Sequence, residues 1–120
     1  LYAGTTSGLF RLRADPQSND SRFEPVEPIK ETVWSLLPLE DSLLVGTQRG
    51  LYEISARTSN LVSTAEVVYD LALSRRDPNL LFAAGRAGAL VFQRSAGKWT
   101  KTAEISGGGE EFCTIAEDDN

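Results

Sequence analysis

The chain of 120 residues contains no histidine, no methionine and a single cysteine. Without histidine, neither a Ser-His-Asp nor a Cys-His catalytic arrangement can be assembled from its own residues. The usual zinc sites, which depend on several Cys and His ligands, are excluded for the same reason. The lone Cys113 cannot form a disulfide within the chain, so cysteine does not report the redox compartment. We expect Cys113 to be a small buried strand residue rather than a nucleophile.

Basic charge and long apolar runs are also scarce. Twelve Lys and Arg against 17 Asp and Glu give a net charge of −5 at pH 7, so a basic surface for nucleic acid or an anionic membrane is not expected. No apolar run approaches the roughly 20 residues that would insert across a membrane. The chain does not begin with Met, and we expect a processed chain or an excerpt from a longer one. Its 41% hydrophobic and 24% charged residues argue against disorder.

One twelve-residue unit occurs three times along the chain. The copies are Leu1–Leu12, Leu43–Ile54 and Leu81–Phe92, and they start about forty residues apart. Each copy has two short apolar runs on either side of a Gly-bounded connection, which is typical of a β-hairpin with a loop of four or five residues. A period of about forty residues with strand-like content predicts a β-propeller or a related array.

Glycine holds the same place in all three hairpins, at Gly8, Gly50 and Gly88. A backbone position with positive φ, or close packing against a neighbour, would require glycine there. A phosphate-binding glycine loop would need a helix N-terminus behind it, and no helical segment follows. These residues are therefore predicted to be turn glycines.

Two further segments complete each repeat. An apolar inner segment that ends in an acidic turn precedes a hairpin, at Val33–Leu37, Val68–Leu73 and Phe112–Ala116. A more polar outer segment follows each hairpin, at Arg22–Val26, Leu61–Ala65 and Trp99–Ile105, and suits a half-exposed strand. The chain thus enters at the second strand of a four-stranded repeat and runs second, third, outer, inner. No segment is predicted to be helical.

The turn Thr114–Asn120 and the hairpin Leu43–Tyr52 resemble the regulator-propeller repeats of hybrid two-component sensors. In that family an Ile-Ala-Glu-Asp-type turn precedes a Leu-Trp-x-Gly-Thr-x-x-Gly-Leu hairpin, and here Leu44 takes the place of Trp. The third repeat resembles the Asp-box propellers through Asp77–Gly85 and Ser95–Trp99, although the Asp of the box is absent. The resemblance implies a sensor domain in signal transduction, with a periplasmic or extracellular location.

The predicted fold class is all-β: residues 1–120 form a single partial β-propeller of three four-stranded antiparallel blades, with repeats starting near 1, 43 and 81. A propeller closes with about four to eight blades, so three leave exposed edges. We expect the remaining blades of an approximately seven-bladed ring to come from the parent chain. Head-to-tail pairing with a second copy is the alternative.

Alignment of the inner segments places Ser35, Asp70 and Thr114 at one equivalent position among apolar neighbours. Inner strands of a propeller line its channel, so these residues are candidates for a polar ring that binds a ligand. The alternative is hydrogen bonding to the backbone of the adjacent blade, which buried polar groups require. Asp70 decides between them most sharply, since a buried lone carboxylate would be costly.

A second candidate site lies on the face that carries the hairpin loops. We predict that Arg49 and Arg86 come from equivalent loop positions, together with Thr6, and that Trp34 and Tyr69 begin their inner strands nearby. Aromatic side chains beside Arg on such a rim suit a small anion, a glycan or a peptide. Packing between blades is the alternative role for the aromatics. The outer-to-inner loops add the charged residues Lys30, Glu31, Glu66 and Glu110.

Adjacent carboxylates occur at Glu40-Asp41, Glu110-Glu111 and Asp118-Asp119. Neighbouring residues in a turn do not hold the separation that glycoside hydrolysis needs, so we interpret them as solvated turn charges. A Ca²⁺ site at Glu117–Asn120 is conceivable by ligand type but lacks the EF-hand spacing. No metal site and no cofactor are predicted.

These observations predict a non-enzymatic ligand-sensing or binding domain of a larger signalling protein. Its partner would be a small molecule, a glycan or a peptide, or another protein, with neither nucleic acid nor membrane insertion. The first alternative is a scaffold for protein–protein assembly. The second is part of a glycosidase or lyase propeller whose catalytic residues lie outside this chain.

Overall fold

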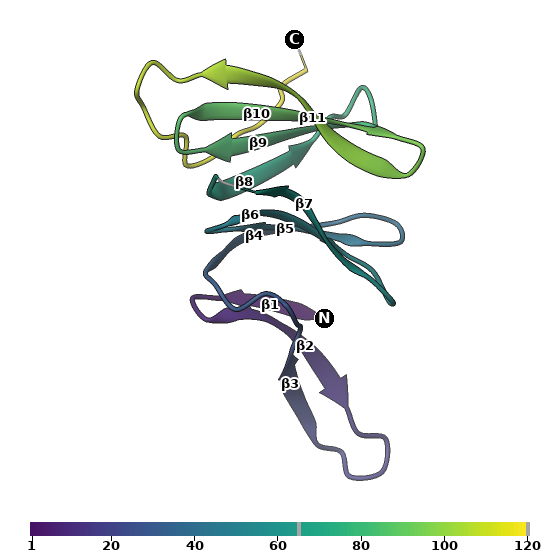
Figure 1. Cartoon of the computed structure of the whole chain (residues 1–120). Helices are drawn as coiled ribbons and strands as arrows, with labels where there is room; N and C mark the ends of the chain where they lie inside the picture. The colour runs from purple at the N-terminus through teal and green to yellow at the C-terminus, as the bar shows by residue number, and fades with distance from the viewer. Residues whose placement is uncertain (65, 120) are drawn as a thin grey trace.

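The computed structural model of this chain describes residues 1–64 and 66–119. Within that part of the chain the regular secondary structure consists of β-strands, and no helix occurs (Figure 1). The strands form three antiparallel sheets, one of three strands and two of four. The expectation of an all-β fold is therefore confirmed.

In each sheet, strands that follow one another along the chain are neighbours. The first sheet contains β1 (Tyr2–Thr5), β2 (Gly8–Ala14) and β3 (Ser21–Pro25). The second sheet contains β4 (Val33–Pro38), β5 (Leu43–Thr47), β6 (Gly50–Ile54) and β7 (Ser59–Thr64). The third sheet contains β8 (Val68–Leu73), β9 (Leu80–Gly85), β10 (Gly88–Ser95) and β11 (Lys98–Ser106).

The structure differs from the prediction of three four-stranded units. Among the described residues β1 pairs only with β2, so the first sheet has three strands. The predicted inner strand Phe112–Ala116 joins no sheet; it lies beside the third sheet, where its contacts are with the Gly85 carbonyl and the Asp70 side chain. The three sheets are not closed into a ring. Two predicted end residues, Ala65 and Asn120, lie outside the described residues.

The three sheets stack face against face in a row, with the second sheet in the middle (Figure 1). The stack measures 53 × 28 × 25 Å, and its radius of gyration is 15.2 Å. A compact domain of this length would have a radius of gyration of about 13.6 Å. The molecule is therefore elongated along the stacking direction.

Tight hairpins join the second and third strands of each repeat. The paired residues that close them are Thr5 with Gly8, Thr47 with Gly50, and Gly85 with Gly88. Each loop between them has two residues, fewer than the four or five predicted. The closing glycines have φ angles of 140°, 145° and 139°, as the glycine pattern predicted. The Thr47 hydroxyl stabilises its hairpin, since it donates to the Gly50 carbonyl at 3.0 Å and accepts from the Arg49 amide at 3.1 Å.

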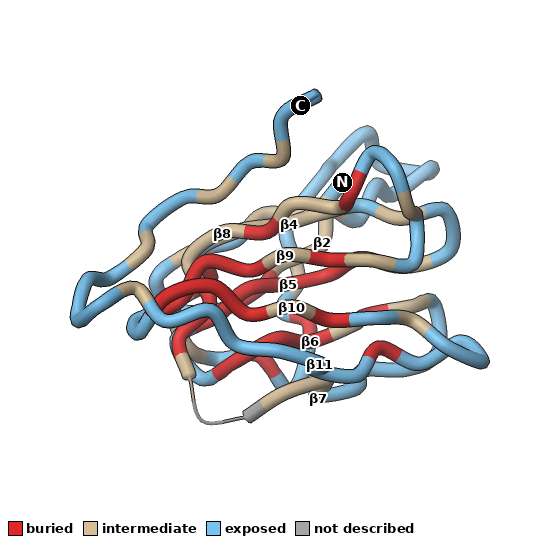
Figure 2. Tube along the Cα trace, turned by 90° about the horizontal axis from the view of Figure 1, so that it is seen from above, coloured by how far each residue is buried: buried red, intermediate tan, exposed pale blue. Residues whose placement is uncertain are grey.

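Two apolar clusters fill the two junctions between sheets, and alternation along β5 accounts for both. Leu43 and Val45 face the first sheet, whereas Leu44 faces the third, because successive strand side chains point to opposite faces. All five residues of β5 are buried, which suits a strand covered on both sides. Figure 2 shows the buried residues concentrated on the central strands, β5, β9 and β10 among them.

The second and third sheets approach each other closely at Gly46 on β5. A Cβ atom at this position would lie 2.6 Å from the Ser35 hydroxyl oxygen and 2.8 Å from the Val68 carbonyl oxygen. Glycine is therefore required here by space, and its absence of a side chain lets β8 pack against the second sheet. This approach brings the beginnings of β4 and β8 side by side.

Candidate functional site

The two aromatic residues predicted on the hairpin face occupy equivalent bulges. The β4–β5 pairing shifts register between Val33 and Ser35, so Trp34 is the extra residue. The β8–β9 pairing shifts in the same way between Val68 and Asp70, so Tyr69 is the extra residue. A bulge bends its strand and re-aims the side chain of the unpaired residue. The repeated bulge therefore turns both aromatic rings toward one another.

Trp34 and Tyr69 form an edge-to-face pair across the junction of the second and third sheets. Their ring centroids are 5.3 Å apart and the ring planes are inclined by 69°. This arrangement is favourable for aromatic rings because the edge of one ring faces the π-cloud of the other. Trp34 is still 49% exposed, and its Nε1 donates to Gln48 Oε1 at 3.1 Å. Much of the indole surface thus faces solvent with its polar edge fixed.

Polar side chains next to the aromatic pair extend the site onto the third sheet. The Tyr69 hydroxyl donates to Glu111 Oε1 at 3.2 Å, and Arg86 Nε donates to the same oxygen at 3.2 Å. The Tyr69 hydroxyl and then the Glu111 carboxylate raise the pKa of Arg86 above its ordinary value. The ion pair is exposed, so it contributes little to stability and mainly orients the two side chains.

Five separate segments therefore supply one connected surface group, which we call the rim cluster: Trp34, Gln48, Tyr69, Arg86 and Glu111. It presents an apolar ring, an amide, a guanidinium and a carboxylate next to one another. Its charges compensate, because Arg86 and Glu111 pair within the cluster. Such a surface can stack on an apolar face of a ligand and exchange hydrogen bonds with hydroxyl groups.

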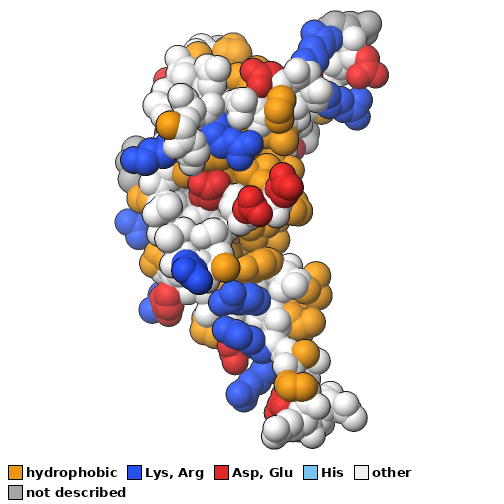
Figure 3. Space-filling view, turned by 90° about the vertical axis from the view of Figure 1, so that its right-hand side faces the viewer, with side chains coloured by type: hydrophobic (Ala, Val, Ile, Leu, Met, Phe, Trp, Pro, Cys, Tyr) orange, Lys and Arg blue, Asp and Glu red, His pale blue; other side chains and the backbone are white. Residues whose placement is uncertain are grey.

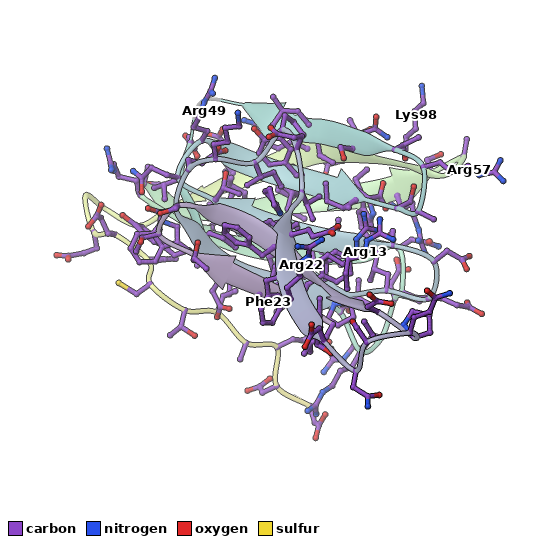
Figure 4. The ribbon with its side chains drawn as sticks, turned by 90° about the horizontal axis from the view of Figure 1, so that it is seen from below. Arg13, Arg22, Phe23, Arg49, Arg57 and Lys98 are labelled. Atoms are coloured by element: carbon purple, nitrogen blue, oxygen red, sulfur yellow. The ribbon has the colours of Figure 1, made fainter. Side chains whose placement is uncertain are left out.

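The predicted equivalence of Arg49 and Arg86 is corrected by the hairpin register. Thr47 pairs with Gly50 and Gly85 with Gly88, so Gln48 is the residue that corresponds to Arg86. Arg49 is the second loop residue, and its side chain extends away from the sheets (Figure 4). Arg49 is therefore not brought into the rim cluster.

The inner-strand candidates Ser35, Asp70 and Thr114 are only partly brought together. The Asp70 carboxylate accepts from the Thr114 hydroxyl at 2.7 Å and from the Ile115 amide at 3.0 Å. Asp70 is thus neither fully buried nor alone, and it holds the neighbouring segment in the way that the hydrogen-bonding alternative described. Ser35 stays apart from them, and its buried hydroxyl oxygen has no hydrogen-bond partner within the described residues.

Sequence reasoning missed Gln48 and Glu111. Gln48 could have been found by aligning the hairpins on their closing glycines, which places it with Arg86. Glu111 carried no signal of its own, since its contact with Tyr69 spans 42 residues. The expectation for Cys113 is wrong: its side chain is exposed, because the segment that carries it joins no sheet.

The acidic residues near the C-terminal end are engaged with the third sheet. Glu117 accepts from the Ser74 hydroxyl at 2.7 Å and from the Arg75 amide at 2.9 Å, and Asp119 pairs with Arg75 at 3.1 Å. These contacts lower the pKa of Glu117, the Ser74 hydrogen bond first and the Arg75 amide second. Across residues 1–64 and 66–119, no group of three His, Cys, Asp or Glu side chains is placed to hold a metal ion.

No helix of the described chain is long and apolar enough to cross a bilayer. Figure 3 shows Lys and Arg side chains spread over the upper and the lower part of the visible side. On the first sheet, Arg13 on β2 pairs with Glu24 on β3 at 3.1 Å.

Comparison of the chain with protein-family models, with curated proteins and with solved structures returns no match. The rim cluster must therefore be interpreted from its own chemistry.

Proposed function

We propose that the three sheets are consecutive blades of a β-propeller and that the rim cluster is its ligand-binding surface. In this proposal the chain acts as a non-enzymatic binding or sensing domain of a larger signalling protein. The observation that carries it is the convergence of Trp34 and Tyr69, from two equivalent bulges, beside Gln48 and the Arg86–Glu111 pair. The repeated four-segment sequence pattern and the stacked sheets support the blade interpretation.

A neutral glycan is the ligand class that the cluster favours. The exposed indole of Trp34 offers an apolar surface for the C–H face of a sugar ring. Gln48, Arg86 and Glu111 offer both donors and acceptors for hydroxyl groups. The mutual neutralisation of Arg86 and Glu111 argues against a strongly charged ligand, since a charged ligand would have to replace one of them.

Fluorescence of Trp34 tests this proposal. The second tryptophan, Trp99, is buried, so a Trp99→Phe variant leaves Trp34 as the reporter at the rim. We expect a saturable change of its emission with at least one member of a panel of neutral oligosaccharides. A Trp34→Ala variant, followed by calorimetry, should lose binding of that oligosaccharide, and Gln48→Ala should weaken it by about tenfold, the loss of one hydrogen bond.

The matched control is Arg57→Ala, which removes an exposed cation at the opposite loops and should leave binding unchanged (Figure 4). Absence of any response to the oligosaccharides, together with a saturable response to short peptides, would replace the glycan with a peptide ligand. Binding that survives Trp34→Ala would remove the rim cluster from the function altogether.

Assembly with other proteins is the second candidate, and exposed apolar side chains favour it. Phe23 on the first sheet is 47% exposed and Ile105 on the third is 56% exposed, and both lie at the ends of the stack. Exposed apolar side chains on an unpaired sheet face are typical of a surface that packs against another chain.

A further inference from the structure

A hollow of about 800 Å³ lies between the second and third sheets, and both of its walls are four-stranded sheets. Its lining comes from the turns β4–β5, β6–β7, β8–β9 and β10–β11 and from the strand ends beside them. Consecutive turns of an antiparallel sheet lie at alternate ends, so this hollow is at the end opposite to the hairpins that carry Gln48 and Arg86. Its volume is within the range of about 300–1,000 Å³ that is usual for ligand pockets.

The alternation of side chains along two strands places one charged residue from each sheet in the hollow. On β6, Leu51 belongs to the apolar cluster between the sheets, and Glu53 projects to the same face. On β10, Phe92 belongs to that cluster, and Arg94 projects to the same face. Both charged side chains line the hollow. The apolar junction thus ends in a carboxylate on one wall and a guanidinium on the other.

These two charges have neutral partners only. Glu53 Oε2 accepts from the Ser42 hydroxyl at 2.9 Å. Arg94 Nε donates to Asn79 Oδ1 at 3.3 Å, and the guanidinium lies 5.2 Å from the centroid of the Trp99 ring. Both residues are half-buried, and neither takes part in an ion pair within residues 1–64 and 66–119. Because a buried charge is costly without a counter-charge, a ligand that supplies one to each wall would be favoured.

The remaining lining residues accentuate the difference between the walls. Glu40 and Asp41 join Glu53 on the side of the second sheet, whereas Arg94 is the one charged lining residue that the described part of the third sheet contributes. Figure 3 shows Asp and Glu side chains near the middle of this side of the molecule, with Lys and Arg side chains above and below. Two apolar lining residues, Leu39 and Leu73, pack against the cluster between the sheets.

We propose that this hollow is a second binding site, and that its ligand is a short peptide with free ends. The terminal ammonium group lies against the acidic wall at Glu53, and the terminal carboxylate pairs with Arg94, since a guanidinium binds a carboxylate through charge-assisted hydrogen bonds. Apolar side chains of the peptide contact Leu39 and Leu73. A neutral ligand would leave both half-buried charges without a counter-charge, and a ligand with one charge would leave one of them so. The site is separate from the rim cluster, and neither proposal depends on the other.

Calorimetry with the dipeptide leucylleucine tests the proposal on the 120-residue chain. We expect saturable binding of the free dipeptide. Its N-acetylated and C-amidated forms are the matched ligands, because each removes one terminal charge and keeps both side chains. Each should bind at least about tenfold more weakly, as expected for the loss of hydrogen bonds to a charged group.

Two variants assign the ends of the peptide to the walls. Arg94→Gln should make the free and amidated dipeptides bind equally, because the charge that distinguishes them is removed. Glu53→Gln should reduce the difference between the free and acetylated dipeptides, while Glu40 and Asp41 remain. Arg22→Gln is the matched control: its side chain on the first sheet is 84% exposed, and both preferences should persist. Circular dichroism checks that each variant is folded.

Three results would overturn the proposal. The first is the absence of saturable heat with leucylleucine up to about 10 mM, beyond which an interaction is too weak to be specific. The second is equal affinity of the native chain for the free, acetylated and amidated dipeptides. The third is full retention of both preferences in Arg94→Gln and Glu53→Gln, which would place the dipeptide outside this hollow. None of these results bears on glycan binding at the rim cluster.

Discussion

Gly46 shows how one residue without a side chain sets the distance between two sheets. Its backbone lies against Ser35 of its own sheet and Val68 of the next, and a methyl group would meet both. The corresponding residue of the third sheet is Ala84, which pairs with Asp70 as Gly46 pairs with Ser35. Ala84 is itself fully buried, so the surroundings of the third sheet accommodate a methyl group where those of the second sheet do not.

Substitution of Gly46 is therefore predicted to be costly. Gly46→Ala should destabilise the fold by about 1–3 kcal/mol, since overpacking forces neighbouring strands apart. Gly85→Ala is the control, because the nearest atom to its new methyl group would lie 3.2 Å away. Urea unfolding of both variants measures the difference. Equal stability of the two variants would contradict this account of the close approach.

Glu117 gives the molecule a predicted pH dependence. Its hydrogen bonds to Ser74 and the Arg75 amide lower the pKa of Glu117 below the ordinary 4.5. A carboxyl group with a lowered pKa stabilises the docked segment above the ordinary value, and this contribution is lost as pH falls through the lowered pKa. The Arg75 amide chemical shift should report this titration. In Glu117→Gln the acid-dependent shift should vanish, and its persistence would assign the titration to another group.

At the scale of single residues, the positions of the turn glycines could be predicted from the sequence, but the register in which strand residues pair could not. The turn glycines at 8, 50 and 88 were predicted from their spacing, because positive φ leaves a direct mark on residue choice. The bulges at Trp34 and Tyr69 leave no such mark, since one extra residue in a strand changes neither composition nor alternation enough to be noticed. Arg49 was aligned with Arg86, one residue too far along, because the hairpin loop has two residues rather than the four or five predicted.

Strands and their neighbours followed from the repeat, whereas the fate of the last inner segment did not. A strand needs an edge to pair with, and Phe112–Ala116 pairs with none of the strands of the described residues. The composition of the segment predicts that it can form a strand, but it does not predict whether a sheet edge is close enough for it to pair with. The segment is therefore held by side chains, with Asp70 as the main acceptor.

Removal of that acceptor should release the segment. Asp70→Ala is predicted to accelerate hydrogen–deuterium exchange at the Ile115 amide, because its acceptor is lost. Asp70→Asn retains a side-chain oxygen and should give a smaller effect. Exchange in β5, which has no contact with this segment, serves as the internal reference. Unchanged protection of Ile115 in Asp70→Ala would show that other contacts hold the segment.

The whole molecule depends on its middle sheet. β4 contacts both β1 and β8, so the second sheet supplies one side of each junction. Leu51 on β6 is fully buried in the junction with the third sheet, whereas Leu61 on β7 is 44% exposed. The two apolar clusters therefore both depend on side chains of the second sheet.

Loss of packing at a junction should therefore affect the entire chain. Leu51→Ala is predicted to lower the free energy of unfolding by about 2–5 kcal/mol, the range for a large-to-small change in a core. Leu61→Ala should change it by less than about 0.5 kcal/mol, as for an exposed site. Denaturant titration followed by circular dichroism compares the two. A mild effect at Leu51 would mean that the sheets are stable without one another.

Because each sheet packs only against the sheet next to it in the stack, this packing does not fix the number of sheets. A further repeat could be gained by duplication, or an existing one lost, without redesign of any sheet other than its immediate neighbour.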